Sequence, residues 1–130
     1  MTIFGAIGMA GTGMTVTRKW MDAISDNLAN ASTVTAMSEE AFRTRYVVAQ
    51  EMADGGVQVA GVALGAAEGR LVHEPDHPLA DADGYVRYPD VDMASQMTQL
   101  IMAQRGYQAN AAVVSRATES YQAALQIGRS

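Results

Sequence analysis

Residues 3–31, IFGAIGMAGTGMTVTRKWMDAISDNLANA, place an apolar or small residue at alternating steps of four and three over four heptads. These positions are Ile3, Ile7, Ala10, Met14, Thr17, Met21, Ile24, Leu28 and Ala31. A heptad pattern of this length predicts a helix that packs on another helix as a left-handed coiled coil. Four glycines between positions 5 and 13 each cost about 1 kcal/mol relative to alanine, so we expect a helix that is weak alone and orders when packed.

The C-terminal segment repeats this pattern without a proline. Its positions are Met93, Met97, Leu100, Ala103, Tyr107, Asn110, Val114, Ala117, Tyr121 and Ala124, again in steps of four and three. We expect Asp92 to cap the start of this helix and Gly128 to end it. Asn110 is polar within the pattern, and a buried polar group at such a position weakens packing but can fix the register of two helices.

The middle of the chain predicts short strands. Phe42, Thr44, Tyr46 and Val48 alternate with polar neighbours, and VQVAGVAL alternates again after an Asp-Gly-Gly turn at 54–56, which together predict a β-hairpin. GRLVHEP adds a short strand, and another is expected at Tyr85 to Tyr88 after the Asp-Gly turn at 83–84. We therefore expect a mainly α fold with a small β insert. Its parts are an N-terminal helix with an Asn-rich turn (1–35), an acidic β-rich insert (36–91) and a C-terminal helix (92–130), forming one structural unit.

Composition and charge exclude several classes of function. The chain has 130 residues, 48% of them hydrophobic, which suits a single domain. It has no cysteine, so disulfides, thiolate metal sites and cysteine nucleophiles are excluded. Residues 36–92 carry eleven acids and four arginines, whereas residues 93–130 carry one acid and three arginines. Neither terminal segment offers a basic stripe dense enough for a phosphate backbone, so we expect no nucleic-acid partner.

The first 17 residues carry no charged side chain, so the stretch could be mistaken for an export signal or a membrane anchor. A secretory signal has basic residues before its apolar stretch, whereas Arg18 and Lys19 follow this one. The stretch is also too short and too rich in glycine to span a membrane. We expect it to belong to the mature protein and not to insert into a membrane.

Two polar motifs offer metal-ligand residue types. His73, Glu74, Asp76 and His77 lie close together, but the prolines at 75 and 78 exclude the helical spacing of a zinc-protease motif. Residues 79–90 can be aligned with a calcium loop through Asp81, Asp83 and Asp90, yet Leu79 at the first ligand position has no side-chain oxygen. No motif frames a nucleophile with a base. We therefore expect no catalytic, cofactor-binding or metal-binding residue; a soluble helical-hairpin binding module with a weak calcium loop is the alternative.

The end of the first helix, SDNLANAS at residues 25–32, places Asn27 and Asn30 where the heptad pattern stops. An amide both donates and accepts hydrogen bonds, so these side chains can satisfy helix-end carbonyls or the backbone of an adjacent subunit. Ordinary C-capping by Asn30 is the simpler interpretation. The alternative hypothesis is that Asn27, Asn30 and Asn110 mark the register of two helices that otherwise offer mainly Ala, Met and Gly.

Three segments carry a family resemblance. SDNLANAST begins at residue 25, VHEPDHPLADADGYVRYPDVD at residue 72 and RGYQANAAV at residue 105. In this order they resemble the flagellar basal-body rod proteins over the whole chain, most closely those of the proximal rod. The segment TAMSEEAFRTR departs from the family, because Glu39 and Glu40 stand in a loop that is usually rich in Gly and Pro and ends in a basic cluster. Gly106 also departs, standing where Ala or Ser is common.

The resemblance implies a structural protein without enzyme activity. It would polymerise through its terminal helices into the proximal part of the drive shaft between motor and hook, where the rod crosses the periplasm. The implied partners are copies of itself, other rod proteins, basal-body ring components and flagellar export components, after export without a cleaved signal. The residues expected at the subunit interface are Asn27, Leu28, Asn30, Met97, Leu100, Tyr107, Gln108, Asn110 and Val114.

Overall fold

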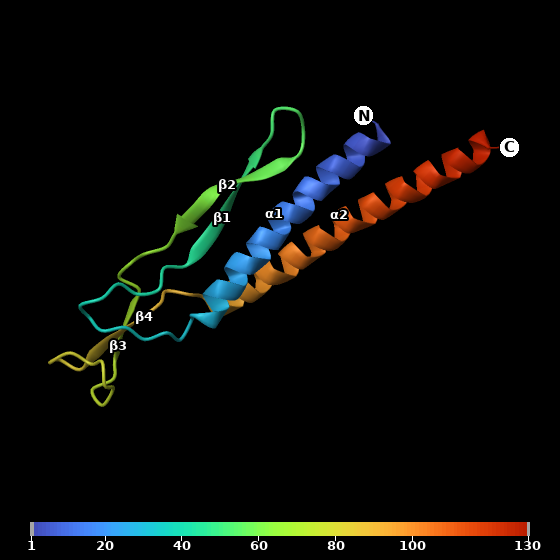
Figure 1. Cartoon of the computed structure of the whole chain (residues 1–130). Helices are drawn as coiled ribbons and strands as arrows, with labels where there is room; N and C mark the ends of the chain where they lie inside the picture. The colour runs from blue at the N-terminus through green and yellow to red at the C-terminus, as the bar shows by residue number, and fades with distance from the viewer. Residues whose placement is uncertain (1, 130) are drawn as a thin grey trace.

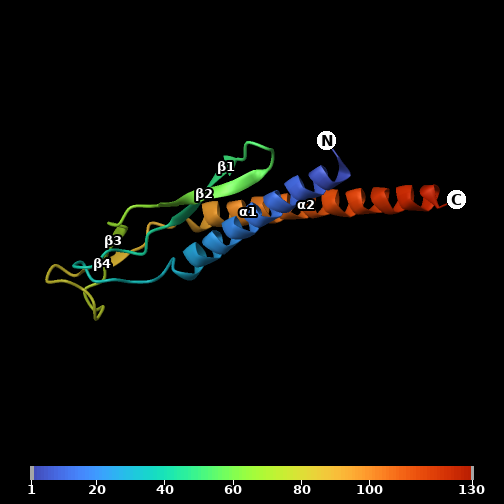
Figure 2. The same cartoon turned by 45° about the horizontal axis from the view of Figure 1, so that its top comes forward.

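The computed structural model describes residues 2–129 and is an elongated molecule built on two long helices. The helices are α1 (Ile3–Ala29) and α2 (Met93–Gly128), and the strands between them are β1 (Arg45–Glu51), β2 (Val57–Leu64), β3 (Arg70–His73) and β4 (Tyr85–Tyr88). The two helices lie side by side and run in opposite directions, so that both chain ends lie at the same end of the molecule (Figure 1). The β3–β4 sheet lies beyond the other end (Figure 2). This is the predicted arrangement of two terminal helices around a small β insert.

Capping residues set the helix boundaries. The hydroxyl of Thr2 accepts a hydrogen bond from the Gly5 amide at 2.9 Å and starts α1, and Asn30 occupies the C-cap position. Asp92 caps α2 as predicted, accepting from the amides of Ala94 and Ser95. These contacts satisfy some of the backbone groups that a helix end leaves without intrahelical partners.

The α1–α2 contact follows much of the predicted heptad pattern. On α1, Ala10 and Ile24 are buried and the intervening pattern positions are at least half-buried. On α2, Ala103 is fully buried and the positions from Tyr107 to Ala117 are half-buried. The pattern fails at its edges: Ala31 lies beyond the end of α1, and Met93 and Met97 are exposed.

The first hairpin, β1–β2, lies along α1 on the side away from α2 (Figure 1). Its strands are antiparallel, with a bulge between Val48 and Ala49. The turn uses Gly55 and Gly56 at φ values of 93° and 89°, a region open to glycine without steric cost. Among residues 2–129, the hairpin contacts α1 but not α2. The helix α1 is therefore packed from two sides by its own chain.

The second hairpin, β3–β4, forms a separate head together with the loops around it. Val86 and Pro89 are fully buried there, next to the buried Ala41 and Thr44. The hydroxyl of Thr44 donates to the Asp90 carbonyl at 2.9 Å and joins the start of the insert to its end. The turn into β4 requires Gly84 at a φ of 83°. A small second core thus holds the head, apart from the contact between the helices.

Candidate assembly interface

Asn27 lies where α1, β1 and α2 meet, and its side chain is fully buried. Its Nδ2 donates to the Arg45 carbonyl at 2.9 Å and to Oε1 of Gln96 at 3.0 Å. Its Oδ1 accepts from the Arg45 amide at 2.8 Å. One amide therefore fixes the start of β1 and the first turn of α2 against the end of α1. The backbone that it satisfies belongs to its own chain.

Gln96 is the partner that the sequence pattern did not identify. Only 2% of its surface is exposed, whereas 48% of its predicted neighbour Met97 is exposed. Counting backwards from Ala103 in strictly alternating steps of three and four gives Leu100 and then Gln96. The predicted pattern has Met97 at this step instead, and the side chain of Met97 is exposed rather than packed on α1. The polar residue at the heptad position is buried because Asn27 satisfies it.

Asn30 shows the simpler of the two predicted roles. Its Nδ2 donates to the Asp26 carbonyl, four residues earlier, at 2.9 Å, and its Oδ1 accepts from the Thr33 hydroxyl at 3.3 Å. The Asp26 carbonyl also accepts the backbone amide of Asn30 at 3.1 Å, so the side chain reinforces the last turn of α1, and the bond to Thr33 begins the following turn. The sequence SDNLANAS thus ends the helix with one amide and attaches it to the rest of the chain with the other.

Asn110 packs into a notch that glycine provides. A Cβ atom at Gly13 would lie 2.7 Å from Nδ2 of Asn110, closer than side-chain atoms pack. One turn along, a Cβ at Gly106 would lie 3.1 Å from Cγ2 of Thr17. Each helix therefore contributes a glycine opposite a polar side chain of the other. Sliding one helix along the other would misplace both pairs, so this contact fixes the intrachain register.

The predicted interface residues fall into two groups. Met97 and Gln108 are exposed on α2. The half-buried ones lie along the helix contact or at the end of α1, namely Leu28, Asn30, Leu100, Tyr107, Asn110 and Val114. Only the first group turns mainly to solvent. Asn27 belongs to neither group, since it is enclosed by its own chain.

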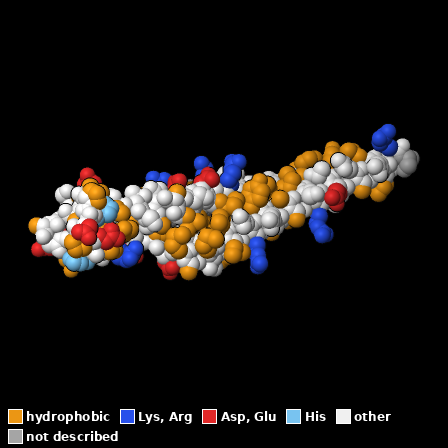
Figure 3. All heavy atoms as spheres, turned by 90° about the horizontal axis from the view of Figure 1, so that it is seen from below, with side chains coloured by type: hydrophobic (Ala, Val, Ile, Leu, Met, Phe, Trp, Pro, Cys, Tyr) orange, Lys and Arg blue, Asp and Glu red, His pale blue; other side chains and the backbone are white. Residues whose placement is uncertain are grey.

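A large apolar surface remains open along the helices. The exposed apolar side chains of α2 include Met93, Met97, Ile101, Met102, Val113 and Leu125, and 64% of Phe4 on α1 is exposed. Figure 3 shows apolar side chains continuing along most of the length of the molecule on one face. Soluble monomers rarely expose continuous apolar patches of this kind, and such patches mark interaction sites.

The helix α2 extends past α1 at the end that carries both termini (Figure 1). It has 36 residues against 27 in α1, which makes it longer by about 13 Å. The rings of Phe4 and Tyr121 meet edge-on, with 5.2 Å between their centroids. Every described residue of α2 after Tyr121 is exposed. Leu125 in this extension is about half-exposed.

Charge is divided between the head and the helices. Acidic side chains gather at the head in Figure 3, whereas lysines and arginines project from the helical part. The ion pair of the described chain joins Arg45 to Asp26 at 2.7 Å and is solvent-exposed on both sides. Arg18 and Lys19 of α1 have no carboxylate within ion-pair distance among residues 2–129.

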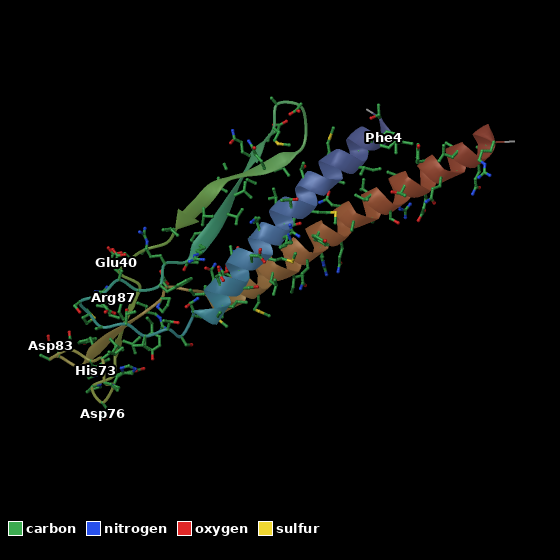
Figure 4. The ribbon with its side chains drawn as sticks, in the orientation of Figure 1. Phe4, Glu40, His73, Asp76, Asp83 and Arg87 are labelled. Atoms are coloured by element: carbon green, nitrogen blue, oxygen red, sulfur yellow. The ribbon has the colours of Figure 1, made fainter. Side chains whose placement is uncertain are left out.

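Arg87 anchors the loop between α1 and β1. Its backbone pairs with Thr35, and its guanidinium donates to the carbonyls of Glu68 and Met37. Figure 4 places Glu40 near Arg87, on the side of the head toward the β1–β2 hairpin. The loop is therefore held to β4 by backbone and guanidinium contacts, while its two glutamates remain exposed.

Tyr88 and Glu74 form the one polar pair of the head with a shifted ionisation. The Tyr88 hydroxyl donates to Oε1 of Glu74 at 2.9 Å. This hydrogen bond raises the pKa of Tyr88 above its ordinary value of 10.0, and partial desolvation and the charge of Glu74 act in the same direction. The pair fixes the start of the loop after β3 to the end of β4.

The calcium alternative finds no support in the geometry of the head. Oδ1 of Asp81 already accepts from the amides of Asp83 and Tyr85 at 3.0 and 2.8 Å, which shapes the turn into β4. Within residues 2–129 no three acidic or histidine side chains come together to hold a metal ion. Neither described helix combines the length and the apolarity that crossing a bilayer requires.

Comparison with known proteins places this architecture in a family. Residues 82–127 match the model of the flagellar basal body rod FlgEFG protein C-terminal family. The chain is 36% identical to the flagellar basal-body rod protein FlgC of Salmonella typhimurium over 134 residues, covering 99% of this chain and 100% of the relative. It is 29% identical to FlgC of Bacillus subtilis over 150 residues, covering 99% and 100%, and 28% identical to FlgC of Borreliella burgdorferi over 149 residues, covering 98% of each. The chain belongs to the FlgC family of flagellar basal-body rod proteins.

Proposed function

We propose that this rod protein performs its structural role by polymerising through α1 and α2, which pack with neighbouring subunits as coiled coils in the proximal part of the rod. The observation that carries the proposal is the apolar surface of α2 that its own chain leaves uncovered. Met97 and Ile101 are each about half-exposed and lie one turn apart on one side of the helix. Leu125, in the extension of α2 beyond Tyr121, is also about half-exposed.

The open side of α1 supports the same proposal. A Cβ atom at Gly8 or Gly11 would have no neighbouring atom within 4 Å, so nothing in the described chain requires glycine at either position. Each still lowers helix stability by about 1 kcal/mol relative to alanine. A neighbouring helix that approaches this side closely would explain both glycines.

The predicted interface residues take different parts in this proposal. Met97 and Gln108 contact the neighbour directly, because both are exposed on α2. Leu28, Leu100, Tyr107 and Val114 contribute the half-buried edge of the α1–α2 contact. Asn27 and Asn110 act as register residues, holding α1, α2 and β1 in the relative positions that a neighbour meets, whereas Asn30 ends α1.

We further propose the partners and the location that the family implies. The partners are copies of the chain, other rod proteins, and components of the basal-body rings and of the export apparatus. The rod crosses the periplasm and transmits torque from motor to hook, so the chain has no catalytic task. Export without a cleaved signal is supported by the N-terminal stretch, since residues 3–17 form the first half of α1 and Phe4 packs on Tyr121.

The experiment replaces Met97 and Ile101 together by aspartate in cells that lack their own copy of the gene. We expect loss of swimming and of rod assembly, because two charges would be placed in a contact from which water is excluded. Thr98→Asp is the matched control, since Thr98 is exposed beside Met97. Circular dichroism checks that both purified variants keep wild-type helicity. Normal assembly of the double variant would overturn the proposal.

A further inference from the structure

We propose that the groove between α1 and the β1–β2 hairpin receives the acidic loop, residues 76–83, of a second copy of the chain. The inference rests on the proposed function and names two surfaces that meet when subunits assemble. Leu79 would enter the groove, and the neighbouring aspartates would approach Lys19 at its rim. The groove and the acidic loop are different surfaces, so each copy of the chain carries one groove and one acidic loop.

The groove is a preformed apolar site of about 310 Å³, the liquid volume of about ten water molecules. Its walls are Thr12, Thr15, Val16 and Lys19 of α1, and Met52, Val57, Gln58 and Val59 of the hairpin. Hydrogen bonds at both ends of the hairpin fix its position against α1 and so fix the shape of the groove. The Val57 amide donates to the Thr12 hydroxyl at 3.1 Å near the turn, and Asn27 binds Arg45 at the base.

Lys19 is the one charged residue that lines this groove. Among residues 2–129, no carboxylate lies within ion-pair distance of its ammonium group. An apolar groove with a single unpaired cation at its rim selects an occupant that combines an apolar side chain with an adjacent carboxylate. Electrostatic complementarity of this kind adds specificity and orientation more than raw affinity.

The acidic loop has this chemistry. Leu79 is exposed, as are Asp76, Asp81 and Asp83 around it. Asp76 and Asp83 lie at the outer ends of the head and point away from the helices (Figure 4). The loop is held in shape by Asp81, which accepts from two amides, and by the Leu79 amide, which donates to Nδ1 of His77 at 3.0 Å. Little conformational freedom would therefore be lost on binding.

A second copy is the occupant because one chain cannot bring the two surfaces together. The groove lies along α1, whereas the acidic loop lies beyond the opposite end of the helix pair (Figure 1). A contact between two different surfaces is heterologous, and it produces rings or open helical assemblies rather than closed two-fold dimers. Such a contact can repeat from subunit to subunit.

The test uses the absence of cysteine from the chain. Thr15→Cys in the groove and Leu79→Cys in the acidic loop are combined in one chain, produced in cells that lack their own copy, and the cells are treated with a mild oxidant. We expect disulfide-linked oligomers larger than dimers, because a disulfide forms only when the two Cα atoms come within about 7 Å. The control combines Thr15→Cys with Glu40→Cys, which is exposed on the head outside the acidic loop, and should give no such series.

Charge reversal supplies the second measurement. Adding Lys19→Glu to the double-cysteine chain should lower the yield of linked oligomers about fivefold, and adding Asp83→Lys as well should restore most of it. Cells that swim under reducing conditions but give no linkage above the control would overturn this inference and leave the proposed function standing. Failure of the cysteine-free chain to restore swimming would instead contradict the proposed function itself.

Discussion

Replacing Gly8 and Gly11 by alanine should stabilise the isolated protein and impair its assembly. Both residues lie inside α1, at the sixth and ninth positions of the helix. A methyl group at either position meets no atom of the described chain within 4 Å, so no packing penalty opposes the substitution. The full difference in helix propensity should therefore appear as stability.

That difference is about 1 kcal/mol for each position, hence about 2 kcal/mol for the double variant. For a chain of 130 residues, about 2 kcal/mol corresponds to a rise in Tm of roughly 7 °C. Thermal unfolding followed by circular dichroism at 222 nm measures the shift on dilute protein. Gly13→Ala is the matched control, because its Cβ would lie 2.7 Å from Nδ2 of Asn110 and the displaced amide would offset the gain.

The same double variant tests assembly in cells. If a neighbouring helix approaches the Gly8–Gly11 side, two added methyl groups push it away, and swimming should fall although the subunit is more stable. Unchanged swimming with a raised Tm would refute the assignment of this side to an interface. An unchanged Tm would refute the argument from helix propensity, since nothing in the described chain opposes the substitution.

Three further predictions concern the fold itself. Asn27→Ala should lower the free energy of unfolding in urea by about 3 kcal/mol, because a buried side chain loses three hydrogen bonds, whereas Asn30→Ala should cost about 1 kcal/mol. Equal losses would contradict the assigned roles. The pKa of Tyr88 is raised, so its bond to Glu74 contributes stability below the unfolded pKa near 10, and this contribution is lost as the pH rises through the folded pKa. Absorbance at 295 nm should show that Tyr88→Phe removes a tyrosine titration that lies above pH 10. Proteinase K should cut dilute protein within residues 3–13 and after Tyr121 before it cuts residues 20–29, where Ala23, Ile24 and Asn27 are buried, and equal rates would contradict this order.

The sequence predicts the helices and strands of this chain well because their signals are local. Asp92 is the capping residue, VQVAGVAL is the second strand, and the Asp-Gly dipeptides mark both hairpin turns. Each of these depends on residues only a few positions apart. A heptad count likewise places Ala103 and Ile24 in the contact between the helices.

The polar contacts of the candidate interface could not be predicted in this way. The bonds of Asn27 to Arg45 and Gln96 join residues 18 and 69 positions apart, and the amide looks the same in sequence whether it faces its own chain or another. Gln96 could have been found from strictly alternating steps of three and four counted back from Ala103. Pairings such as that of Thr12 with Val57 depend on how the hairpin lies on α1, which no local signal specifies.

The glycines and amides of the two helices divide into groups with different consequences. Gly13 and Gly106 each face a side chain of the opposite helix, and Asn27 and Asn30 bond within the chain, so their contacts are complete in one subunit. Gly8 and Gly11 face nothing in the described chain. Because the satisfied residues fix the register of α1 against α2 before any neighbour arrives, a neighbour meets a surface of defined shape. We infer that specificity in assembly comes from this preset shape together with charge, while the apolar side chains of α2 supply most of the binding free energy.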